Sequence, residues 1–361
     1  MIIKSVELNN FRNYESLNIS FEKGINILYG NNAQGKTNLL EAAYLCGTSK
    51  SHKSSKDKEL IKFNEDEAHV KTCVEKSGNE LLIDIHLRKN KSKGIAVNKI
   101  PLKKASDLFG NLNVVFFSPE DLNIIKESPA ERRRFIDQEL CQIDRIYLHN
   151  LTNYNKALAQ RNKLLKDIHF HPSLKDTLSV WDDQLINFGK NVILKRRQFI
   201  EEIGRIVLDI HSKITGNNDS LIMKYEPDIE SEFFMDELIK NHDKDLKYET
   251  TSVGPHRDDI SFFLEGVDIR KFGSQGQQRT VALCLKLAEI EIVKKTIGDD
   301  PVLLLDDVMS ELDSSRQNYL LENINTSQTI ITCTGIDDFI KSRCTIDKVF
   351  NVTNGVVTEE K

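Results

Sequence analysis

LYGNNAQGKTNLLEAAYL (residues 28–45) is the most informative stretch of this sequence. Within it, residues 30–37 fit the pattern G-x-x-x-x-G-K-T, follow the apolar run INILY and precede a helix-forming run, which is the context of a P-loop. The glycines let backbone N–H groups converge on phosphate oxygens, and the N-terminal end of the next helix adds positive charge. The stretch therefore predicts a nucleotide site. The alternative is a glycine turn that binds nothing.

We expect ATP and Mg²⁺ at this loop. Lys36 is predicted to be a surface charge that reaches the outer phosphates, and Thr37 is predicted to offer its hydroxyl to Mg²⁺. Asn32 and Gln34 line the cradle and contact either phosphate or a partner chain. The complete set of loop residues expected at the nucleotide is Gly30, Asn31, Asn32, Ala33, Gln34, Gly35, Lys36 and Thr37.

A second element near the other end of the chain supports this site. PVLLLDDVMSELD (residues 301–313) is an apolar run that ends in two carboxylates, as expected of a buried strand. Asp306 is placed to hold the Mg²⁺ of a nucleotide seated at Lys36, and Asp307 then points toward the attacking water. We therefore predict Asp307 and Lys36 as catalytic residues, with Thr37 and Asp306 as the Mg²⁺ ligands. On its own, a pair of aspartates at a strand end is often only a solvated turn.

Length and composition indicate an ordinary globular chain with two lobes. It has 361 residues, of which 39% are hydrophobic and 29% charged, and its formal net charge is −5. The longest apolar runs are far too short to cross a membrane, and the N-terminus does not resemble a signal peptide, so we expect a cytoplasmic protein with no membrane partner. The six cysteines contain no C-x-x-C pair, which argues against a zinc site and a disulfide framework.

The character of the chain changes at SPAERRRFID (residues 128–137). Ser128 is a good N-cap, Pro129 fits the first helical position and Glu131 completes a capping box, so a long helix is predicted to start there. Apolar residues then recur at heptad-like spacing on both sides of HFHPSL (residues 169–174), which predicts an antiparallel helical hairpin. We predict an α/β lobe from residues 1–118 and 296–361, with a mainly helical lobe, residues 119–295, inserted into it.

Two stretches of positive charge are hidden by the negative net charge. Residues 88–106 (RKNKSKGIAVNKIPLKKAS) carry only positive charges, and residues 50–62 (KSHKSSKDKELIK) are also rich in lysine. Both are candidates for contact with a polyanion. Solvated surface loops remain an equally good interpretation from charge alone.

Several further motifs carry a family resemblance. GSQGQQRT (residues 273–280), upstream of the LLLDD strand, resembles the signature motif of ABC-type ATPases, and SELD (residues 310–313) resembles their D-loop. Together with FRNY (11–14), FSPEDL (117–122), RRRFID (132–137) and SVGPHRDD (252–259), these motifs resemble the RecF family of bacterial recombination mediators. They are spread over nearly the whole chain, and GPHRDD beside GSQGQQRT is much more specific than a P-loop.

The resemblance implies a fold and a function. The fold is an α/β, ABC/SMC-type P-loop ATPase head, related to those of Rad50 and the SMC proteins, with a short helical arm in place of their long coiled coils. Members bind ATP at two composite sites in an ATP-dependent homodimer, and the dimer binds DNA. The family is associated with single-strand gaps and acts with RecO and RecR to help load RecA, in replication, repair and the SOS response.

The resemblance also implies roles for residues outside the P-loop. Ser274, Gly276 and Gln277 are expected to contact the γ-phosphate of the partner's nucleotide, and Arg12 is expected to reach the nucleotide. For Ser274 the alternative is a plain helix cap, and for Arg12 it is an exposed surface charge. His256 and Arg257 have no arrangement around them that defines a metal or nucleophile site, so we expect them to position the junction between the lobes.

The chain departs from the broader ABC pattern. Its signature reads SQGQQ and not L-S-G-G-Q, Asp307 replaces the usual Glu, and no switch histidine follows the TIIT strand. Glu120 is the nearest polar candidate for a Q-loop residue. From these departures we expect weak, DNA-stimulated ATPase activity that serves as a switch. The rival interpretation, the ATPase subunit of an ABC transporter, requires a membrane partner and a closer signature match.

Overall fold

The computed structural model describes residues 1–361 except 54–55, 217–218, 325, 336–344 and 361. The chain forms two compact units, which are described separately: unit 1 is Met1–Asp121 with Lys286–Lys361, and unit 2 is Leu122–Leu285. The second division falls inside one continuous helix, α9 (Gln275–Ile297), whereas the sequence-based boundary after residue 295 assigned almost all of it to the helical lobe. Because α9 is one continuous helix, its sequence pattern has no break at the residue where unit 2 ends and unit 1 resumes.

Unit 1 contains a six-stranded, mainly parallel sheet with the strand order β15-β14-β3-β13-β12-β8. All neighbours in it pair in parallel except β14 and β15. The strands β8, β12 and β13 are buried at every position, as is usual for parallel strands covered on both faces. The strand bounds are β3 Ile25–Tyr29, β8 Val114–Phe117, β12 Val302–Asp306, β13 Thr329–Cys333, β14 Ile346–Thr353 and β15 Val356–Glu360.

The second six-stranded sheet of unit 1 is antiparallel, with the order β2-β1-β4-β5-β6-β7. Buried and solvated positions alternate along β4 and the second half of β5, so one face packs on the core and the other meets water. Its strands are β1 Ile2–Phe11, β2 Tyr14–Ser20, β4 Glu67–Lys76, β5 Asn79–Arg88, β6 Gly94–Val97 and β7 Ile100–Pro101.

The helix α1 (Lys36–Thr48) joins the two sheets into one core. Its residues Leu39, Leu40 and Ala43 belong to the same buried cluster as Val70 of β4 and Leu304 of β12. Glycine at position 47 allows close packing, because a Cβ there would lie 2.8 Å from a methyl carbon of Val114. The remaining elements of this unit are η1 Asp57–Leu60, η2 Ala105–Leu108, η3 Pro119–Asp121, η7 Val308–Glu311, α10 Ser314–Ile324 and the second half of α9.

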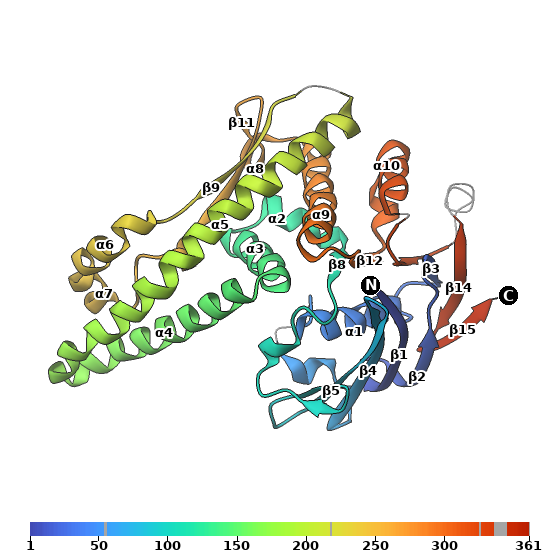
Figure 1. The fold of residues 1–361 in the computed structure, drawn as a ribbon, viewed down its shortest axis with the longest axis horizontal. Helices are drawn as coiled ribbons and strands as arrows, with labels where there is room; N and C mark the ends of the chain where they lie inside the picture. The colour runs from blue at the N-terminus through green and yellow to red at the C-terminus, as the bar shows by residue number, and fades with distance from the viewer. Residues whose placement is uncertain (54–55, 217–218, 325, 336–344, 361) are drawn as a thin grey trace. The chain divides into compact units, whose positions relative to one another are not determined.

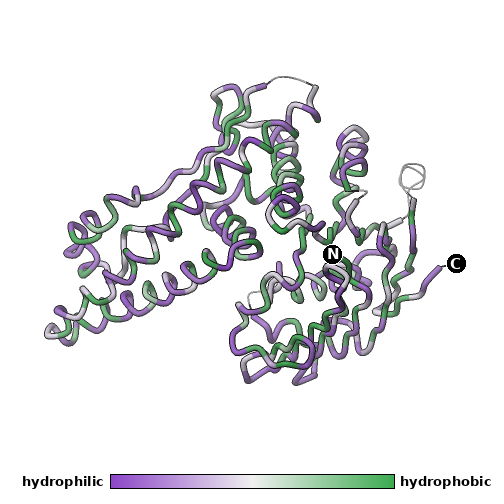
Figure 2. Tube along the Cα trace, in the orientation of Figure 1, coloured by the Kyte–Doolittle hydropathy of each residue, from purple (hydrophilic) through white to green (hydrophobic). Residues whose placement is uncertain are grey.

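Unit 2 is built on the predicted helical hairpin. Helices α4 (Arg145–Phe170) and α5 (Leu178–Thr215) run antiparallel and pack side by side, joined by the 3-10 turn η4 (Pro172–Thr177) (Figure 1). Hydrophobic and hydrophilic residues are interleaved along both helices, as the heptad-like spacing predicts (Figure 2). The other elements are α2 Leu122–Lys126, α3 Pro129–Ile143, β9 Leu221–Glu226, η5 Ser231–Phe233, α6 Phe234–Lys240, α7 His242–Tyr248, η6 Pro255–Arg257, β10 Asp259–Leu264, β11 Val267–Asp268 and α8 Ile269–Phe272.

Two details of the helical prediction are wrong. The helix that begins at Pro129 ends at Ile143, and Asp144 starts a new helix by accepting hydrogen bonds from the backbone N–H of Ile146 and Tyr147, both at 2.9 Å. Aspartate competes for backbone donors in this way and so favours a cap over a helix interior. The expected capping box is also absent from α3: Ser128 precedes the helix in an extended conformation, but its side chain makes no capping hydrogen bond.

A buried ionic network fixes the hairpin to the rest of unit 2. The Arg161 side chain is fully buried on α4, and its guanidinium contacts Asp182 of α5 at 2.6 Å and Asp245 of α7 at 2.7 Å. Breaking such a pair leaves an uncompensated buried charge, so the network selects one register of α4 against α5. Of the cysteines, Cys46, Cys141, Cys284 and Cys333 are buried, and Cys344 lies outside the described residues. No helix in the described part of the chain is long and apolar enough to cross a bilayer.

Candidate nucleotide-binding site

The predicted phosphate loop lies between β3 and α1. The strand β3 ends at Tyr29 and α1 begins at Lys36, so the loop leads directly into a helix N-terminus. Gly30, Ala33 and Gly35 have positive φ angles of 152°, 64° and 119°. A Cβ on Gly30 would lie 2.3 Å from the carbonyl oxygen of Val352, so glycine is required there by space as well as by conformation.

The FRNY motif (residues 11–14) holds this loop through two hydrogen bonds. The Asn13 amide donates to the Gln34 carbonyl at 2.9 Å, and the Tyr14 hydroxyl donates to the Gly35 carbonyl at 3.1 Å. On the other side, the backbone N–H of Asn354 donates to the Gln34 side chain at 2.6 Å. Asn31, Asn32 and Ala33 remain exposed at the rim. The loop is therefore held in shape by β1–β2 and by the β14–β15 turn.

Lys36 differs from its prediction as a surface charge. Its residue is 8% exposed, and its ammonium donates to the carbonyls of Gly30 at 2.6 Å and Asn31 at 2.8 Å. Burial lowers the pKa of this ammonium from its ordinary value, while the carboxylates of Asp306 and Asp307 oppose the shift. Lys36 thus links the end of the loop to its first two residues. A phosphate oxygen of a nucleotide is an alternative acceptor for the same ammonium.

Strand pairing brings the second predicted element to the loop. The Thr37 hydroxyl donates to Asp306 Oδ1 at 2.7 Å, although the two residues come from opposite ends of the chain. Asp306 pairs with Thr332 in the parallel register, and the Thr332 hydroxyl donates to the same carboxylate at 2.8 Å. Sequence reasoning missed Thr332. The only available signal was its place at the end of the TIIT strand, next to Asp306 in a parallel sheet.

Asp307 adopts a strained backbone conformation directly after β12. Its φ is 55°, in the left-handed region, and its N–H donates to the Thr332 hydroxyl at 3.0 Å. Burial, followed by the neighbouring Asp306 charge, raises the pKa of its carboxyl above the ordinary value. Its assignment as the residue that directs the attacking water stays a prediction.

The side chains at this site fit a magnesium ion. Mg²⁺ prefers oxygen ligands at about 2.0–2.1 Å in octahedral geometry, which places adjacent ligand oxygens about 2.9 Å apart. The hydroxyl of Thr37 and the carboxylate of Asp306, 2.7 Å apart, already have nearly this separation. Lys53 lies at the same carboxylate, with its ammonium 3.7 Å from Asp306 Oδ2. The two predicted metal ligands therefore lie side by side at a separation that suits Mg²⁺.

Arg12 has a protein partner that the sequence did not reveal. Its guanidinium forms a two-pronged ion pair with Glu41 of α1, at 2.7 and 2.8 Å, and also donates to the Glu59 carbonyl at 2.8 Å. Burial raises the pKa of the Glu41 carboxyl, but hydrogen bonds from Arg12 and Ser51 outweigh it and hold the pKa below its ordinary value. Arg12 thus has a structural role in bracing α1, and its contact with nucleotide stays a prediction.

The signature residues lie in unit 2, at the start of α9. The Ser274 N–H donates to the Gln277 side chain at 2.8 Å, and the Gln277 N–H donates to the Ser274 hydroxyl at 3.3 Å. This reciprocal pair is a capping box, so the helix-cap interpretation of Ser274 is confirmed. Ser274, Gly276 and Gln277 are all exposed, and their contact with a partner's nucleotide stays a prediction.

His256 and Arg257 belong to a structural turn of unit 2. The His256 ring lies between the Tyr154 hydroxyl, 2.6 Å from Nδ1, and the Thr251 carbonyl, 3.1 Å from Nε2. Burial lowers the pKa of this imidazole from its ordinary value. The preceding Gly254 has φ of 133°, and a Cβ there would lie 2.6 Å from the Tyr154 hydroxyl. The turn is fixed against α4, while the predicted role at the junction of the lobes stays untested.

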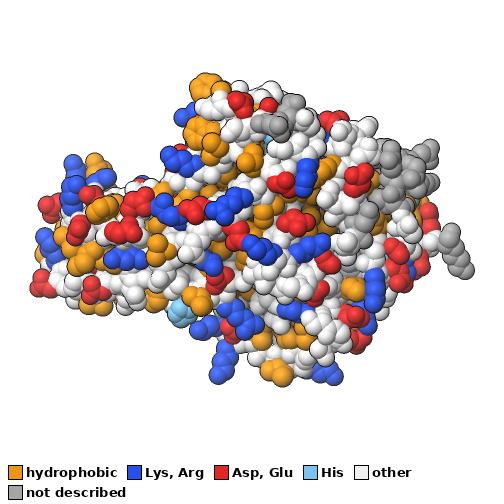
Figure 3. All heavy atoms as spheres, turned by 45° about the horizontal axis from the view of Figure 1, so that its top comes forward, with side chains coloured by type: hydrophobic (Ala, Val, Ile, Leu, Met, Phe, Trp, Pro, Cys, Tyr) orange, Lys and Arg blue, Asp and Glu red, His pale blue; other side chains and the backbone are white. Residues whose placement is uncertain are grey.

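The basic stretch at residues 88–106 comprises the end of β5, the short strands β6 and β7 and their connecting turns. Lys93 is not available to a polyanion, because its ammonium contacts Asp57 at 3.0 Å and also donates to the Ser49 carbonyl. Lys91, Lys103 and Lys104 are exposed. On the face drawn in Figure 3, basic and acidic side chains are interspersed. Whether a given lysine can contact a polyanion therefore depends on its own neighbours and exposure more than on the net charge of the chain.

A P-loop beside a parallel sheet that carries Asp306, interrupted in sequence by a helical unit, defines an ATPase head of the ABC/SMC type. The family described as "RecF/RecN/SMC N terminal domain" matches residues 2–358, and the identity to two curated RecF proteins shows that the chain belongs to the RecF family. It is 65% identical to the "DNA replication and repair protein RecF" of Agathobacter rectalis over 99% of both chains. It is 58% identical to the protein of the same name from Lachnospira eligens over 100% of both chains.

Solved structures agree with this assignment. A structure described as "the recombination mediator protein RecF-ATP in RecFOR pathway" is 38% identical, with a TM-score of 0.93 over 99% of this chain and 97% of that one. An Smc head domain from Pyrococcus furiosus has a TM-score of 0.57 over 99% of this chain and 95% of that one, at 19% identity. The second likeness concerns the fold alone.

Proposed function

We propose that this protein is an ATP-dependent, DNA-binding recombination mediator. The observation that carries the proposal is the assembled site of unit 1, in which Lys36, Thr37 and Asp306 lie together at a phosphate loop. A relative with nearly the same fold is described as a recombination mediator bound to ATP, and close relatives are described as DNA replication and repair proteins. Both facts support a nucleotide-controlled role on DNA over transport across a membrane.

Within one protomer, each residue of the site has a defined task. Lys36 exchanges its loop carbonyls for phosphate oxygens, and Thr37 and Asp306 hold Mg²⁺, which neutralises phosphate charge when it is bound. Thr332 keeps the Asp306 carboxylate oriented through its hydroxyl. Asp307 directs the attacking water, and its carboxylate is one methylene shorter than the usual glutamate, which favours slow turnover.

Two protomers complete each other's sites. The exposed signature residues Ser274, Gly276 and Gln277 of one protomer donate hydrogen bonds to the γ-phosphate held by its partner, and two-fold symmetry repeats the arrangement. The homodimer therefore closes on DNA only with nucleotide in place. Hydrolysis removes the bridging contact and weakens the dimer, so the slow, DNA-stimulated ATPase reaction sets the time of release.

The DNA target and the partners are proposed from the family resemblance. The clamp acts at junctions of single- and double-stranded DNA in gaps, and it cooperates with RecO and RecR in loading RecA during replication, repair and the SOS response. The description of a solved relative, which places it in the RecFOR pathway, supports this part of the proposal.

Mixing two inactive variants tests the composite site. Lys36→Ala removes a phosphate ligand and Ser274→Arg blocks the signature, so neither homodimer has an intact site. If the two pair at random, about half of the dimers are mixed and each has one intact site, which gives about a quarter of wild-type ATPase activity. ATP-dependent cross-linking establishes that mixed dimers form. Mixed dimers that bind no nucleotide at the intact site would contradict the proposal.

Two further variants separate the trans contact from the helix cap. Aspartate caps a helix as well as serine does, so Ser274→Asp preserves α9 but brings negative charge to the partner's phosphate. Ser274→Thr keeps both the cap and the hydroxyl. We expect ATP-dependent dimerisation to be lost in Ser274→Asp and retained in Ser274→Thr. Equal dimerisation of the two would leave Ser274 with its capping role alone.

A further inference from the structure

The solvated face of the antiparallel sheet carries a cluster of side chains with metal-ligand chemistry. Glu67 and His69 are two residues apart on β4, so they lie on the same face of the strand. His86 of β5 is the direct cross-strand partner of His69. One acidic oxygen and two imidazole nitrogens are thereby brought together by the register of β4 against β5.

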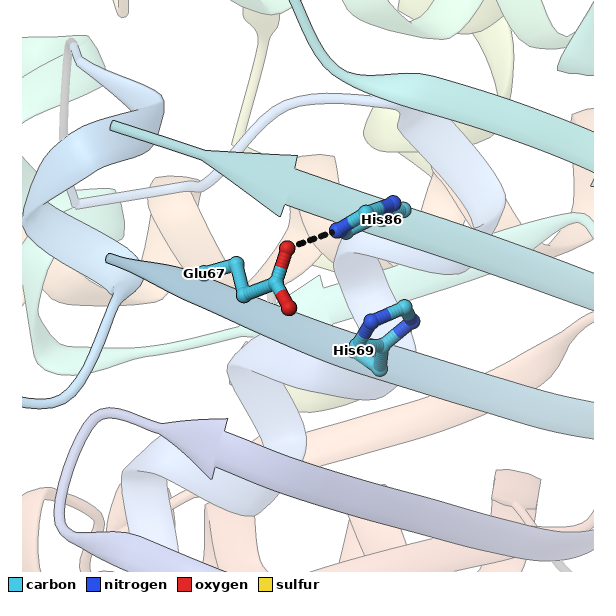
Figure 4. Close-up of side chains that lie close together, drawn as sticks. All are labelled: Glu67, His69 and His86. Carbon is cyan, nitrogen blue, oxygen red and sulfur yellow. Dashed lines mark hydrogen bonds and ion pairs between the residues drawn. The ribbon is translucent and has the colours of Figure 1, made fainter. Parts of the chain in front are cut away.

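The three side chains converge in space (Figure 4). His86 Nε2 lies 2.9 Å from Glu67 Oε2, and the rings of His69 and His86 stack with their centroids 4.0 Å apart. One ligand atom from each residue can be chosen so that all three lie within 4.8 Å of one another. In a tetrahedral zinc site with bonds of about 2.0–2.2 Å, ligand atoms are about 3.4 Å apart, and each imidazole binds in its ring plane. The two stacked rings, whose planes are 18° apart, therefore turn out of the stack until one nitrogen of each points at the ion.

One side of the cluster is bordered by a residue without a side chain. Gly94 of β6 pairs with His86 on its other side and carries no side chain at that register. Glu67 is largely exposed, and the side chains of His69 and His86 are half-buried. The basic neighbour Arg88, opposite Glu67, directs its guanidinium to the carbonyl of Ser92 at 3.0 Å. The site is therefore open to solvent on one side and supported by the sheet on the other.

We propose that Glu67, His69 and His86 form a binding site for one zinc ion. Two imidazoles and one carboxylate are a ligand set that zinc accepts with water in the fourth position, whereas Mg²⁺ and Ca²⁺ prefer oxygen ligands throughout. The ion links β4 to β5 on the face opposite the core. The ligand set of this site differs from that of the predicted Mg²⁺ site, whose ligands Thr37 and Asp306 offer only oxygen.

Calorimetric titration of the full-length protein tests the site. The protein is stripped with a chelator, dialysed, and titrated with zinc chloride in excess Mg²⁺ without nucleotide, so that oxygen-only sites are already filled. We expect one zinc ion per chain. Because loss of outer-shell partners alone weakens metal binding about 10–100-fold, His69→Ala and His86→Ala should weaken it at least about 100-fold, and Glu67→Gln at least about tenfold.

A matched variant and a second readout make the outcome decisive. His149→Ala removes an exposed histidine of α4 that contacts Asn153 and the Phe188 ring and lies outside the cluster, and it should bind zinc like the wild type. Zinc should raise the thermal unfolding midpoint of the wild type and of His149→Ala, but not of His69→Ala or His86→Ala. A wild type that takes up no zinc, or unchanged binding in the three cluster variants, would overturn the proposal and leave an ordinary cross-strand cluster.

Discussion

The two six-stranded sheets of unit 1 differ in where their side chains are accessible to a ligand. In the parallel sheet, β12 and β13 are buried along their whole length, so side chains become available to a ligand only where the strands end, as at Asp306 of β12. In the antiparallel sheet, alternation leaves one face of β4 in water, and His69 lies on that face within the strand. A sheet covered on both faces has sites at its edge, and a sheet covered on one face also has sites on its surface.

The largest expected effect of a substitution is the loss of ATP binding at the phosphate loop, which lies at the edge of the parallel sheet. Lys36→Ala should abolish ATP binding and ATP-dependent DNA binding, because it removes the ammonium that lies at the phosphate loop. The two carbonyls that it contacts, those of Gly30 and Asn31, face the loop, so the loss of stability without nucleotide should be only about 1 kcal/mol. Nucleotide binding is measured by calorimetry and folding by thermal unfolding. Undiminished ATP-dependent DNA binding by the folded variant would contradict the site.

Alanine substitutions at two neighbouring residues of β12 and at two of β4 test whether each sheet is covered on both faces or on one. In β12 the adjacent residues Leu303 and Leu304 are both fully buried, so each change to alanine should cost about 2–5 kcal/mol of unfolding free energy. In β4, Val70→Ala should be costly in the same way, whereas Lys71→Ala should change stability by no more than about 0.5 kcal/mol. Urea unfolding measures all four variants. Similar costs for Val70 and Lys71 would show that both faces of the antiparallel sheet are covered in solution.

The ion pair of Arg12 and Glu41 connects the end of β1 to α1, and it should have a pH-dependent effect. Arg12→Ala leaves the buried Glu41 carboxylate without its ion-pair partner, with the Ser51 hydroxyl as a remaining donor, at a cost of about 3 kcal/mol at neutral pH. The folded-state pKa of Glu41 lies below its unfolded value, so the stabilisation is complete above the unfolded pKa and is lost as pH falls through the folded pKa.

The stability difference between wild type and Arg12→Ala should therefore narrow as the pH is lowered below about 4.5. Urea unfolding at a series of pH values measures it, with Lys71→Ala as the control whose difference from wild type stays small throughout. A difference that stays constant on acidification would mean that Glu41 is already protonated in the folded wild type, and one that widens would contradict the predicted direction of the pKa shift.

Local sequence was sufficient for the phosphate loop, the buried strand that ends at Asp306 and the helical hairpin, because each depends on spacing within a few residues. Thr332, Glu41 and the pairing of His69 with His86 depend on strand register and on helix packing, which spacing along the chain does not encode. The break at Asp144 was missed for another reason. The apolar repeat continues across it, and only the capping preference of aspartate marks the boundary.

The smallest expected effect concerns the turns of the antiparallel sheet, where the basic stretch of residues 88–106 lies. Lys93 is committed to Asp57, so the candidates for DNA contact include the exposed Lys91, Lys103 and Lys104. Changing these three to glutamate should weaken binding to all DNA sequences alike and reduce the slope of log affinity against log salt by about 0.9 for each lost duplex phosphate contact. Lys93→Gln serves as the contrast, since it should lower stability and leave the slope unchanged. An unaltered slope in the triple variant would mean that these turns are solvated loops and that DNA lies elsewhere on the protein.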